Sequence, residues 1–260
     1  MRLTAVSADF WRITRPVAGS ALLSLLLALG GCASSSDSSP EWAGVRNEDA
    51  PAKLVNFDET TEFIVRWHRD IGDSSTSLLQ PALTGNAIYA VSADGYLSRL
   101  DRDTGKKVWR IKTGIAVSAG VGSGEGMVVV GGGKGEVLAF DESGKQLWQG
   151  KVSSEALSLS EVVDGMVVVR SGDGRIIGLN AVNGQQAWVF ERSTPALVVR
   201  SHAGVTIQRG VVLAGLAGGK LVAIRVSNGE VLWETSVSQP RGNTELERIS
   251  DITSNPVVDD

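Results

Sequence analysis

The sequence has little of what metal sites, disulfide frameworks and nucleic-acid-binding surfaces need. Its 260 residues include one cysteine and two histidines, too few for an internal disulfide or for a zinc site built from Cys and His. Acidic residues outnumber basic ones by 29 to 25, so the net charge is -4, and no basic surplus indicates binding to a phosphate backbone. We therefore expect no nucleic-acid partner, no metal and no cofactor.

What the sequence has in abundance favours β-structure. Hydrophobic residues make up 42% of the chain, enough to bury a sizeable core, and 31 residues are glycine. Valine is frequent, and Asp-Gly or related pairs recur between apolar segments. Valine suits strands, and such pairs permit the positive φ angles of tight hairpins. The composition predicts an all-β chain.

The N-terminal segment has the layout of a secretion signal. Three arginines, at positions 2, 12 and 15, precede an apolar run over residues 17–29. The run is shorter than a typical membrane span and suits the apolar region of a signal peptide. We expect residues 1–31 to be such a signal and to take no part in the fold.

The apolar run ends at Leu29-Gly-Gly-Cys32. This sequence resembles the lipobox of bacterial lipoproteins, in which the cysteine thiol receives a diacylglyceryl group. We expect Cys32 to be lipidated and residues 32–50 to form a flexible polar tether. Ala33 follows the cysteine where inner-membrane lipoproteins commonly have Asp, which favours the outer membrane.

A repeat of about forty residues organises the rest of the chain. Glycine and tryptophan recur in the pattern Gly-x-x-x-Trp at intervals of 39, 40 and 45 residues. The four copies begin at Gly105, Gly144, Gly184 and Gly229. Forty residues is the length of one β-propeller blade. We predict blades of four antiparallel strands over residues 72–114, 115–152, 153–194 and 195–240.

Two features of the repeat indicate that the blades stack face to face. Residues 127–130 and 166–169 are continuous apolar runs, which suit strands covered on both faces. The recurring tryptophan lies near the start of the outermost predicted strand, where a large ring can wedge between neighbouring blades. We therefore predict a structural docking role for Trp109, Trp148, Trp188 and Trp233.

The two ends of the predicted propeller look incomplete. The segment Phe63-Ile-Val-Arg-Trp67 reads as a solitary outer strand, and Asn255-Pro-Val-Val resembles Gln80-Pro-Ala-Leu, so residues 250–260 read as the start of a fifth blade. We expect residues 51–260 to form part of a larger, C-terminally truncated ring. Such an open arc exposes its terminal sheets and is prone to aggregate.

The repeat unit is a strand followed by Asp or Asn, Thr or Ser, Gly and Trp, complete in this order in the first two copies, and it resembles the tryptophan-docking repeat of pyrroloquinoline-quinone (PQQ) dehydrogenases. That repeat also occurs in proteins that are not enzymes. Together with the lipobox, the sequence resembles the BamB family, eight-bladed propeller lipoproteins of the machinery that assembles outer-membrane β-barrels. The stretches over residues 195–202 and 242–251 carry this resemblance most specifically.

The resemblance implies a non-enzymatic scaffold on the periplasmic face of the outer membrane. It implies docking on a polypeptide-transport-associated (POTRA) domain of BamA, contact through BamA with the other lipoproteins of the machinery, and assistance to nascent outer-membrane proteins. In the family, a Leu-x-Leu-Arg segment and a nearby Asp-x-Asp form the docking surface. The matching positions are Leu197, Val199 and Arg200, then Asp251 and Thr253. Thr253 lacks the second carboxylate of the family pattern.

Two other functions stay open at the level of sequence. PQQ dehydrogenases resemble this chain in their blades, but they add a Ca²⁺ site, a catalytic Asp and often adjacent cysteines, and this chain has one cysteine. A generic propeller that binds peptides along an exposed sheet edge is the other alternative. The Gly131-Gly-Gly-Lys-Gly135 segment lacks the Ser or Thr and the helix of a phosphate loop, so we interpret it as a hairpin turn.

Overall fold

The computed structural model describes residues 55, 60–74, 77–193, 195 and 197–259. Contacts divide the chain into two units, Met1–Glu62 and Phe63–Asp260, and all the strands belong to the second. The predicted signal peptide, Cys32 and the tether lie outside the described residues. In the described part of the chain, no helix has the length and apolar character needed to cross a membrane.

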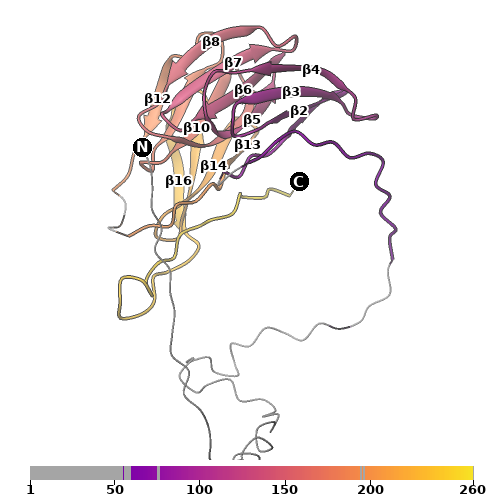
Figure 1. Ribbon diagram of the computed structural model, residues 1–260. Coiled ribbons are helices and arrows are strands. Elements are labelled where there is room, and N and C mark those ends of the chain that lie inside the picture. The colour runs from indigo at the N-terminus through magenta and orange to yellow at the C-terminus, as the bar shows by residue number, and fades with distance from the viewer. Residues whose placement is uncertain (1–54, 56–59, 75–76, 194, 196, 260) are drawn as a thin grey trace, which may run out of the picture. The chain divides into compact units, whose positions relative to one another are not determined.

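The strands form four antiparallel sheets of four, and within each sheet consecutive strands are neighbours (Figure 1). The first sheet contains β1 (Ala82–Thr84), β2 (Ala87–Val91), β3 (Tyr96–Asp101) and β4 (Lys107–Lys112). The second contains β5 (Val117–Gly124), β6 (Met127–Gly132), β7 (Glu136–Asp141) and β8 (Gln146–Lys151). The third contains β9 (Ala156–Val163), β10 (Met166–Ser171), β11 (Ile176–Asn180) and β12 (Gln186–Phe190). The fourth contains β13 (Val205–Gln208), β14 (Val211–Leu216), β15 (Lys220–Arg225) and β16 (Val231–Ser236). The predicted all-β fold of four-stranded blades is confirmed.

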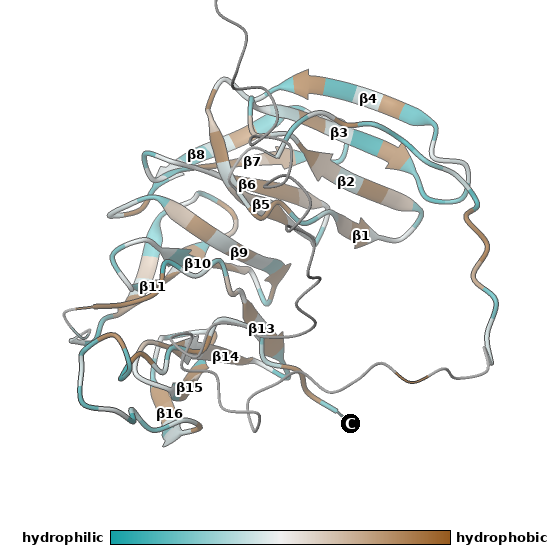
Figure 2. Ribbon diagram, turned by 60° about the horizontal axis from the view of Figure 1, so that its bottom comes forward, coloured by the Kyte–Doolittle hydropathy of each residue, from teal (hydrophilic) through white to brown (hydrophobic). Residues whose placement is uncertain are grey.

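The first strand of each sheet is its innermost strand. Strand β5 contacts β1 on one side and β9 on the other, and β9 in turn contacts β13 (Figure 2). Hydroxyl groups reinforce this order: Ser118 Oγ donates to the Ala156 carbonyl at 2.7 Å, and Ser158 Oγ donates to the Ala203 carbonyl at 3.3 Å. The four sheets therefore follow one another in sequence order around their inner strands, as propeller blades do.

The apolar runs singled out in the sequence lie in the middle strands β6 and β10. The valines at positions 128–130 and 167–169 have no exposed surface, because the second and third sheets each have a neighbouring sheet on both faces. Tight turns connect the strands. Gly135, which follows β6, has φ +82°, and a Cβ there would lie 2.6 Å from the Val152 carbonyl oxygen. The segment from Gly131 to Gly135 is thus a hairpin turn between β6 and β7.

The recurring tryptophans reach from one blade to the next. Each indole N–H donates to a backbone carbonyl in the following blade: Trp109 to Glu142 at 2.9 Å, Trp148 to Ala181 at 2.6 Å and Trp188 to Val226 at 2.6 Å. Each of these carbonyls belongs to the residue directly after the last residue of the third strand in its blade. Docking of this kind fixes the distance and angle between adjacent sheets.

The glycine of the repeat receives the tryptophan of the preceding blade, not that of its own. A Cβ on Gly184 would lie 2.3 Å from the Trp148 ring, and a Cβ on Gly229 would lie 2.8 Å from Trp188. Both glycines also have positive φ angles, +71° and +75°, which other residues adopt at a cost. In each Gly-x-x-x-Trp copy, the glycine therefore belongs to the interface with the preceding blade, and the tryptophan belongs to the interface with the following blade.

The structure differs from the sequence prediction around Trp67. Residues 60–72 belong to no strand, since none of the described strands pairs with them. Trp67 nevertheless makes the docking contact, because its indole N–H donates to the Arg102 carbonyl at 2.9 Å. The ring lies over Gly105, whose added Cβ would meet it at 2.5 Å. The first blade thus receives a tryptophan in the same way as the others.

The structure also differs from the prediction at residues 250–259, which form no strand. They lie instead against the fourth blade, where Thr206 Oγ1 donates to the Pro256 carbonyl and the Gly204 amide donates to the Asn255 side chain. The Thr206 contact repeats the inner-strand contacts of Ser118 and Ser158. The segment therefore occupies the position of a next inner strand without strand pairing.

Trp233 is the one predicted docking tryptophan without an acceptor among the described residues. It is 46% exposed, whereas Trp148 is 9% and Trp188 is 7% exposed. All six residues of its strand, β16, are exposed. The outer strand of the fourth blade is therefore exposed at the position where the second and third blades bury their docking tryptophans.

Aspartate organises the turn that contains the Glu142 carbonyl, the acceptor of Trp109. Asp141 Oδ1 accepts hydrogen bonds from the Ser143 hydroxyl at 2.6 Å and from the Ser143 and Lys145 amides, both at 2.9 Å. The pKa of the Asp141 carboxyl is lowered, mainly by the hydrogen bond from the Ser143 hydroxyl. Donors arranged in this way stabilise the ionised form of the carboxyl group.

We expect Asp141→Ala to lower the Tm at neutral pH and to have less effect in acid. A folded-state pKa below the usual value stabilises the fold above the unfolded-state pKa, and this stabilisation is lost as the pH falls through the folded-state pKa. The Tm difference between variant and parent should therefore shrink as the pH drops below about 4. Asp103→Ala is the control, since no hydrogen bond to its side chain is formed among the described residues. A Tm difference independent of pH would contradict this account.

Candidate functional site

The predicted docking residues come from two loops on the fourth blade, and the structure brings them together. Residues 197–200 precede β13, and Asp251 follows β16. Asp251 Oδ2 accepts a hydrogen bond from the Val199 amide at 2.7 Å, and Asp251 Oδ1 accepts one from the Gly218 amide at 2.9 Å. This carboxylate bridges the 197–200 segment and the turn between β14 and β15. Asp251 therefore holds the segment in place through its backbone.

Close packing brings the second loop to this position. The Ile252 amide donates to the Leu216 carbonyl at 3.2 Å, and the Ile252 side chain lies over Gly215, where an added Cβ would meet it at 2.4 Å. A glycine at the end of β14 thus admits the Ile252 side chain against the sheet backbone. The neighbouring Thr253 is exposed, so the departure from the family pattern falls at the surface.

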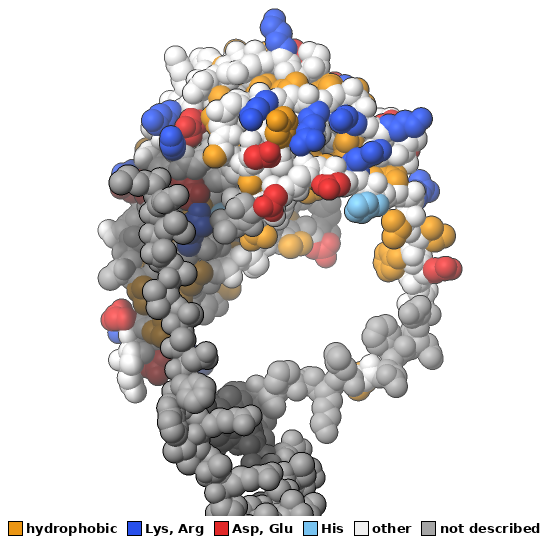
Figure 3. All heavy atoms as spheres, in the orientation of Figure 1, with side chains coloured by type: hydrophobic (Ala, Val, Ile, Leu, Met, Phe, Trp, Pro, Cys, Tyr) orange, Lys and Arg blue, Asp and Glu red, His pale blue; other side chains and the backbone are white. Residues whose placement is uncertain are grey.

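The 197–200 segment presents apolar side chains to solvent. Leu197, Val198 and Val199 are each 44% exposed. On the face shown in Figure 3, most hydrophobic side chains over the blades lie among Lys, Arg, Asp and Glu. Phe63, Ile64 and Val65 are a second consecutive apolar stretch and are 91%, 79% and 82% exposed. Three consecutive half-exposed aliphatic residues on a hydrogen-bonded segment are a preformed apolar surface, which is typical of the core of a protein interface.

Arg200 is already ion-paired within the chain. Its Nη2 lies 2.7 Å from both carboxylate oxygens of Glu155, at the start of the third blade. The Arg200 side chain is 54% exposed and that of Glu155 is 27% exposed, so the pair adds little to stability. It does set the direction of Arg200 beside the apolar segment. The sequence prediction of Arg200 as a docking residue did not include this internal partner.

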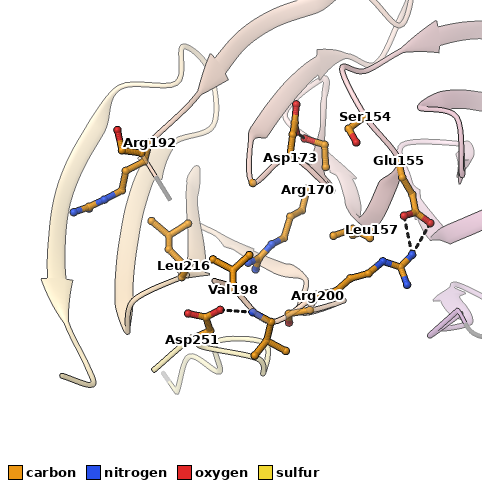
Figure 4. A pocket seen from close by; sticks show the side chains of 17 residues that line it. Ser154, Glu155, Leu157, Arg170, Asp173, Arg192, Val198, Arg200, Leu216 and Asp251 are labelled. Atoms are coloured by element: carbon orange, nitrogen blue, oxygen red, sulfur yellow. Dashed lines mark hydrogen bonds and ion pairs between the residues drawn. The ribbon is translucent and has the colours of Figure 1, made fainter. Parts of the chain in front are cut away.

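A cavity of about 380 Å³ opens beneath the 197–200 segment, between the third and fourth blades (Figure 4). Leu157, Val198 and Leu216 form apolar parts of its wall, and Arg170 from the end of β10 extends into it. Arg170 Nη1 donates to the Gly215 carbonyl at 2.8 Å and to the Ala203 carbonyl at 3.4 Å. Burial lowers the pKa of the guanidinium, and the negative charge of Asp251 partly offsets this.

Sequence reasoning missed Glu155, Arg170 and Gly218, the residues that complete this site. Each lies 33 to 45 residues from its partner in the chain, so no local pattern joins them. The repeat offered one usable signal. Arg170 follows the apolar run over residues 166–169, whereas a glycine, Gly131, follows the corresponding run over residues 127–130 of the second blade. Among the described residues, no group of three His, Cys, Asp or Glu side chains is placed to hold a metal ion.

Comparison with known proteins agrees with this fold. The family model described as the outer membrane protein assembly factor BamB matches residues 93–260. The BamB of Nitrosomonas eutropha is 44% identical over 248 residues, covering 92% of this chain and 60% of that protein. The BamB of Pseudomonas aeruginosa is 44% identical over 236 residues, covering 89% of this chain and 60% of that protein. The chain thus spans about 60% of the length of these curated relatives.

Solved structures agree with the sequence relatives. The crystal structure of BamB from Moraxella catarrhalis matches with a TM-score of 0.64 and 25% identity, covering 70% of this chain and 55% of that one. A quinohemoprotein alcohol dehydrogenase from Pseudomonas putida matches with a TM-score of 0.50 and 16% identity, covering 65% of this chain and 35% of that one, which shows a shared fold alone. The resemblance drawn from the repeat, the lipobox and the stretches over residues 195–202 and 242–251 is confirmed, and the chain belongs to the family of the outer membrane protein assembly factor BamB.

Proposed function

We propose that this chain is a non-enzymatic scaffold of the outer-membrane β-barrel assembly machinery and that its 197–200 segment docks on a POTRA domain of BamA. The observation that carries the proposal is the hydrogen-bonded apolar segment described above. Leu197, Val198 and Val199 are half exposed, and Asp251 holds the segment from below. Burial of three aliphatic side chains by a partner provides affinity, and their fixed backbone reduces the entropy lost on binding.

The sequence supports lipid anchoring as part of the same proposal. Cys32, with its preceding apolar run and small residues, is the expected lipidation site. Several acyl chains on one N-terminus give stable membrane attachment, because each buried methylene contributes about 0.8 kcal/mol. The propeller then lies on the periplasmic face of the outer membrane, where it meets BamA and nascent outer-membrane proteins.

A binding experiment with the periplasmic region of BamA tests the docking surface. We expect Leu197→Asp to weaken binding at least about tenfold, which corresponds to about 1.4 kcal/mol, because a charge replaces an apolar contact. Val182→Asp is the matched control, since Val182 is 80% exposed in the turn between β11 and β12. Equal affinities of Leu197→Asp and the parent chain would contradict the proposal.

Arg200 is tested by a charge swap with its internal partner. Arg200→Glu places two carboxylates together, and Glu155→Arg in the same chain restores an ion pair of reversed sign. If Arg200 contacts the partner, the double variant still binds weakly although its Tm equals that of the parent. If Arg200 only orients the loop, the double variant regains the parent affinity.

Two measurements separate this proposal from the alternatives. A PQQ dehydrogenase would give cofactor absorbance and dye reduction when the chain is held with PQQ and Ca²⁺, and we expect neither. A generic peptide-binding propeller would bind extended peptides along a sheet edge. Its affinity for BamA would then not depend on Leu197.

A further inference from the structure

The cavity beneath the 197–200 segment holds a cation, Arg170, that forms no direct ion pair in the described part of the chain. Its Nη1 donates to two backbone carbonyls. A guanidinium has five N–H donors. Its Nη1 accounts for two of them, and Figure 4 shows the side chain extending toward Val198 and Asp251 inside the cavity.

The carboxylates that line the same cavity are all occupied by donors of this chain. Glu155 is paired with Arg200, and Asp251 accepts from the Val199 and Gly218 amides. Asp173 accepts from the Ser171 hydroxyl at 2.5 Å and pairs with Arg175 at 2.6 Å. None of these groups lies within ion-pair distance of Arg170. The negative charge of Asp251 acts on Arg170 without direct contact, and its oxygens accept from backbone amides, so the remaining Arg170 N–H groups face the cavity without a carboxylate bound to them.

Buried charges in proteins are normally paired, because removal from water without a partner costs free energy. The five ion-paired cations of the third and fourth blades follow this rule and are nearer the surface: Arg175, Arg192, Arg200, Lys220 and Arg225. Arg170 departs from it at the floor of an accessible cavity with apolar walls. A carboxylate on a short aliphatic side chain would complement both the positive charge of Arg170 and the apolar walls of the cavity.

We propose that a carboxylate side chain of the docked protein enters this cavity and pairs with Arg170. The inference rests on the proposed docking of the 197–200 segment, and it adds the chemistry that the partner must supply. The apolar segment then covers the rim of the contact, and Arg170 selects a partner loop with Asp or Glu at its tip. Exclusion of water by Leu197, Val198 and Val199 strengthens the ion pair.

Binding of the full chain to the periplasmic region of BamA tests this assignment. We expect Arg170→Met to weaken binding about thirtyfold or more, since truncation of one partner of a buried ion pair strands the other. Arg170→Lys should regain part of the affinity, because a cation returns without the planar fork. Arg170→Met also removes the hydrogen bonds to the Gly215 and Ala203 carbonyls, so we expect a modest fall in Tm, and binding is measured well below the Tm of the variant. Arg225→Met, which removes an exposed cation of the fourth blade that does not line the cavity, is the control and should bind like the parent.

A double-mutant cycle identifies the partner group. Each Asp or Glu of the BamA region is changed to Asn or Gln and combined with Arg170→Met. We expect one carboxylate whose loss has no further effect once Arg170 is gone. Parent-like binding of Arg170→Met, or the absence of any coupled carboxylate, would overturn the assignment.

A second readout does not depend on BamA. Titration with sodium butyrate should shift the Arg170 Nε–H resonance in NMR spectra of the parent chain, whereas butylamine at the same concentrations should leave it in place. If the parent chain does not bind BamA, the proposed docking is wrong. The butyrate titration then decides by itself whether the cavity binds a carboxylate. No shift with butyrate would then overturn the proposal that the cavity accepts a carboxylate.

Discussion

We expect Trp188→Ala to lower the free energy of unfolding by about 3–5 kcal/mol, the usual range for loss of a buried large aromatic side chain. Trp188 is 7% exposed and packs against the fourth blade with its indole N–H on the Val226 carbonyl. The substitution leaves a cavity between two sheets and a carbonyl without its donor. It also removes the ring that Gly178 and Gly229 are shaped to receive.

Trp233→Ala is the matched control for this prediction. Trp233 occupies the same position of the repeat, but it is 46% exposed and docks on no described residue. We expect its replacement to cost roughly 1–2 kcal/mol, less than that of Trp188, because about half of the Trp233 surface already faces water. Urea unfolding of both variants, followed by circular dichroism, measures the two effects. Equal destabilisation by Trp188→Ala and Trp233→Ala would contradict the docking role assigned to blade-to-blade contacts.

Asp251→Ala has the second large effect, and it acts on the candidate site. The substitution leaves the Val199 and Gly218 amides without their acceptor. Hydrogen bonds to a charged group contribute about 1.5–3 kcal/mol each, and the two share one side chain, so we expect a loss of roughly 2–4 kcal/mol. The 197–200 segment then loses its fixed position.

Amide hydrogen exchange separates the local from the global part of this effect. In Asp251→Ala we expect faster exchange at Val199 and Gly218 than at the core amides of β6 and β10. Thr253→Ala, two residues further along the chain, is the control because Thr253 is exposed. Unchanged exchange at Val199 in Asp251→Ala would contradict the bridging role of the carboxylate.

The fold follows from the sequence because the repeat is periodic and local. The spacing of glycine and tryptophan, the turn dipeptides and the valine runs each predict the same four-stranded unit. Agreement of several local signals makes such a prediction strong. The segment around Trp67 and the segment over residues 250–259 did not become strands, because a strand needs a hydrogen-bonded neighbour and the described residues offer none.

The partner of each tryptophan could not be read from its own repeat. The pattern places Gly184 and Trp188 four residues apart, yet Gly184 receives Trp148 and Trp188 lies over Gly229. Only the stacking of blades creates these contacts. Periodicity thus predicts the unit, whereas the interface between units requires the structure.

The candidate site was predictable only in part. Leu197, Val199, Arg200 and Asp251 came from a family resemblance, and the structure places all four around one loop. Whether each residue contacts a partner or positions another side chain depends on long-range contacts. Asp251 holds backbone amides, Arg200 pairs with Glu155, and Arg170 lies beneath both. No spacing in the sequence distinguishes these roles.

Site-specific photo-crosslinking in cells tests the central claim most directly. A photoreactive residue at position 198, in the middle of the 197–200 segment, is compared with the same residue at position 182, which is 80% exposed on the third blade. The account predicts that position 198 captures BamA, that position 182 does not, and that Asp251→Ala abolishes the capture. Equal capture at both positions, or capture at position 198 that is unaffected by Asp251→Ala, would contradict it.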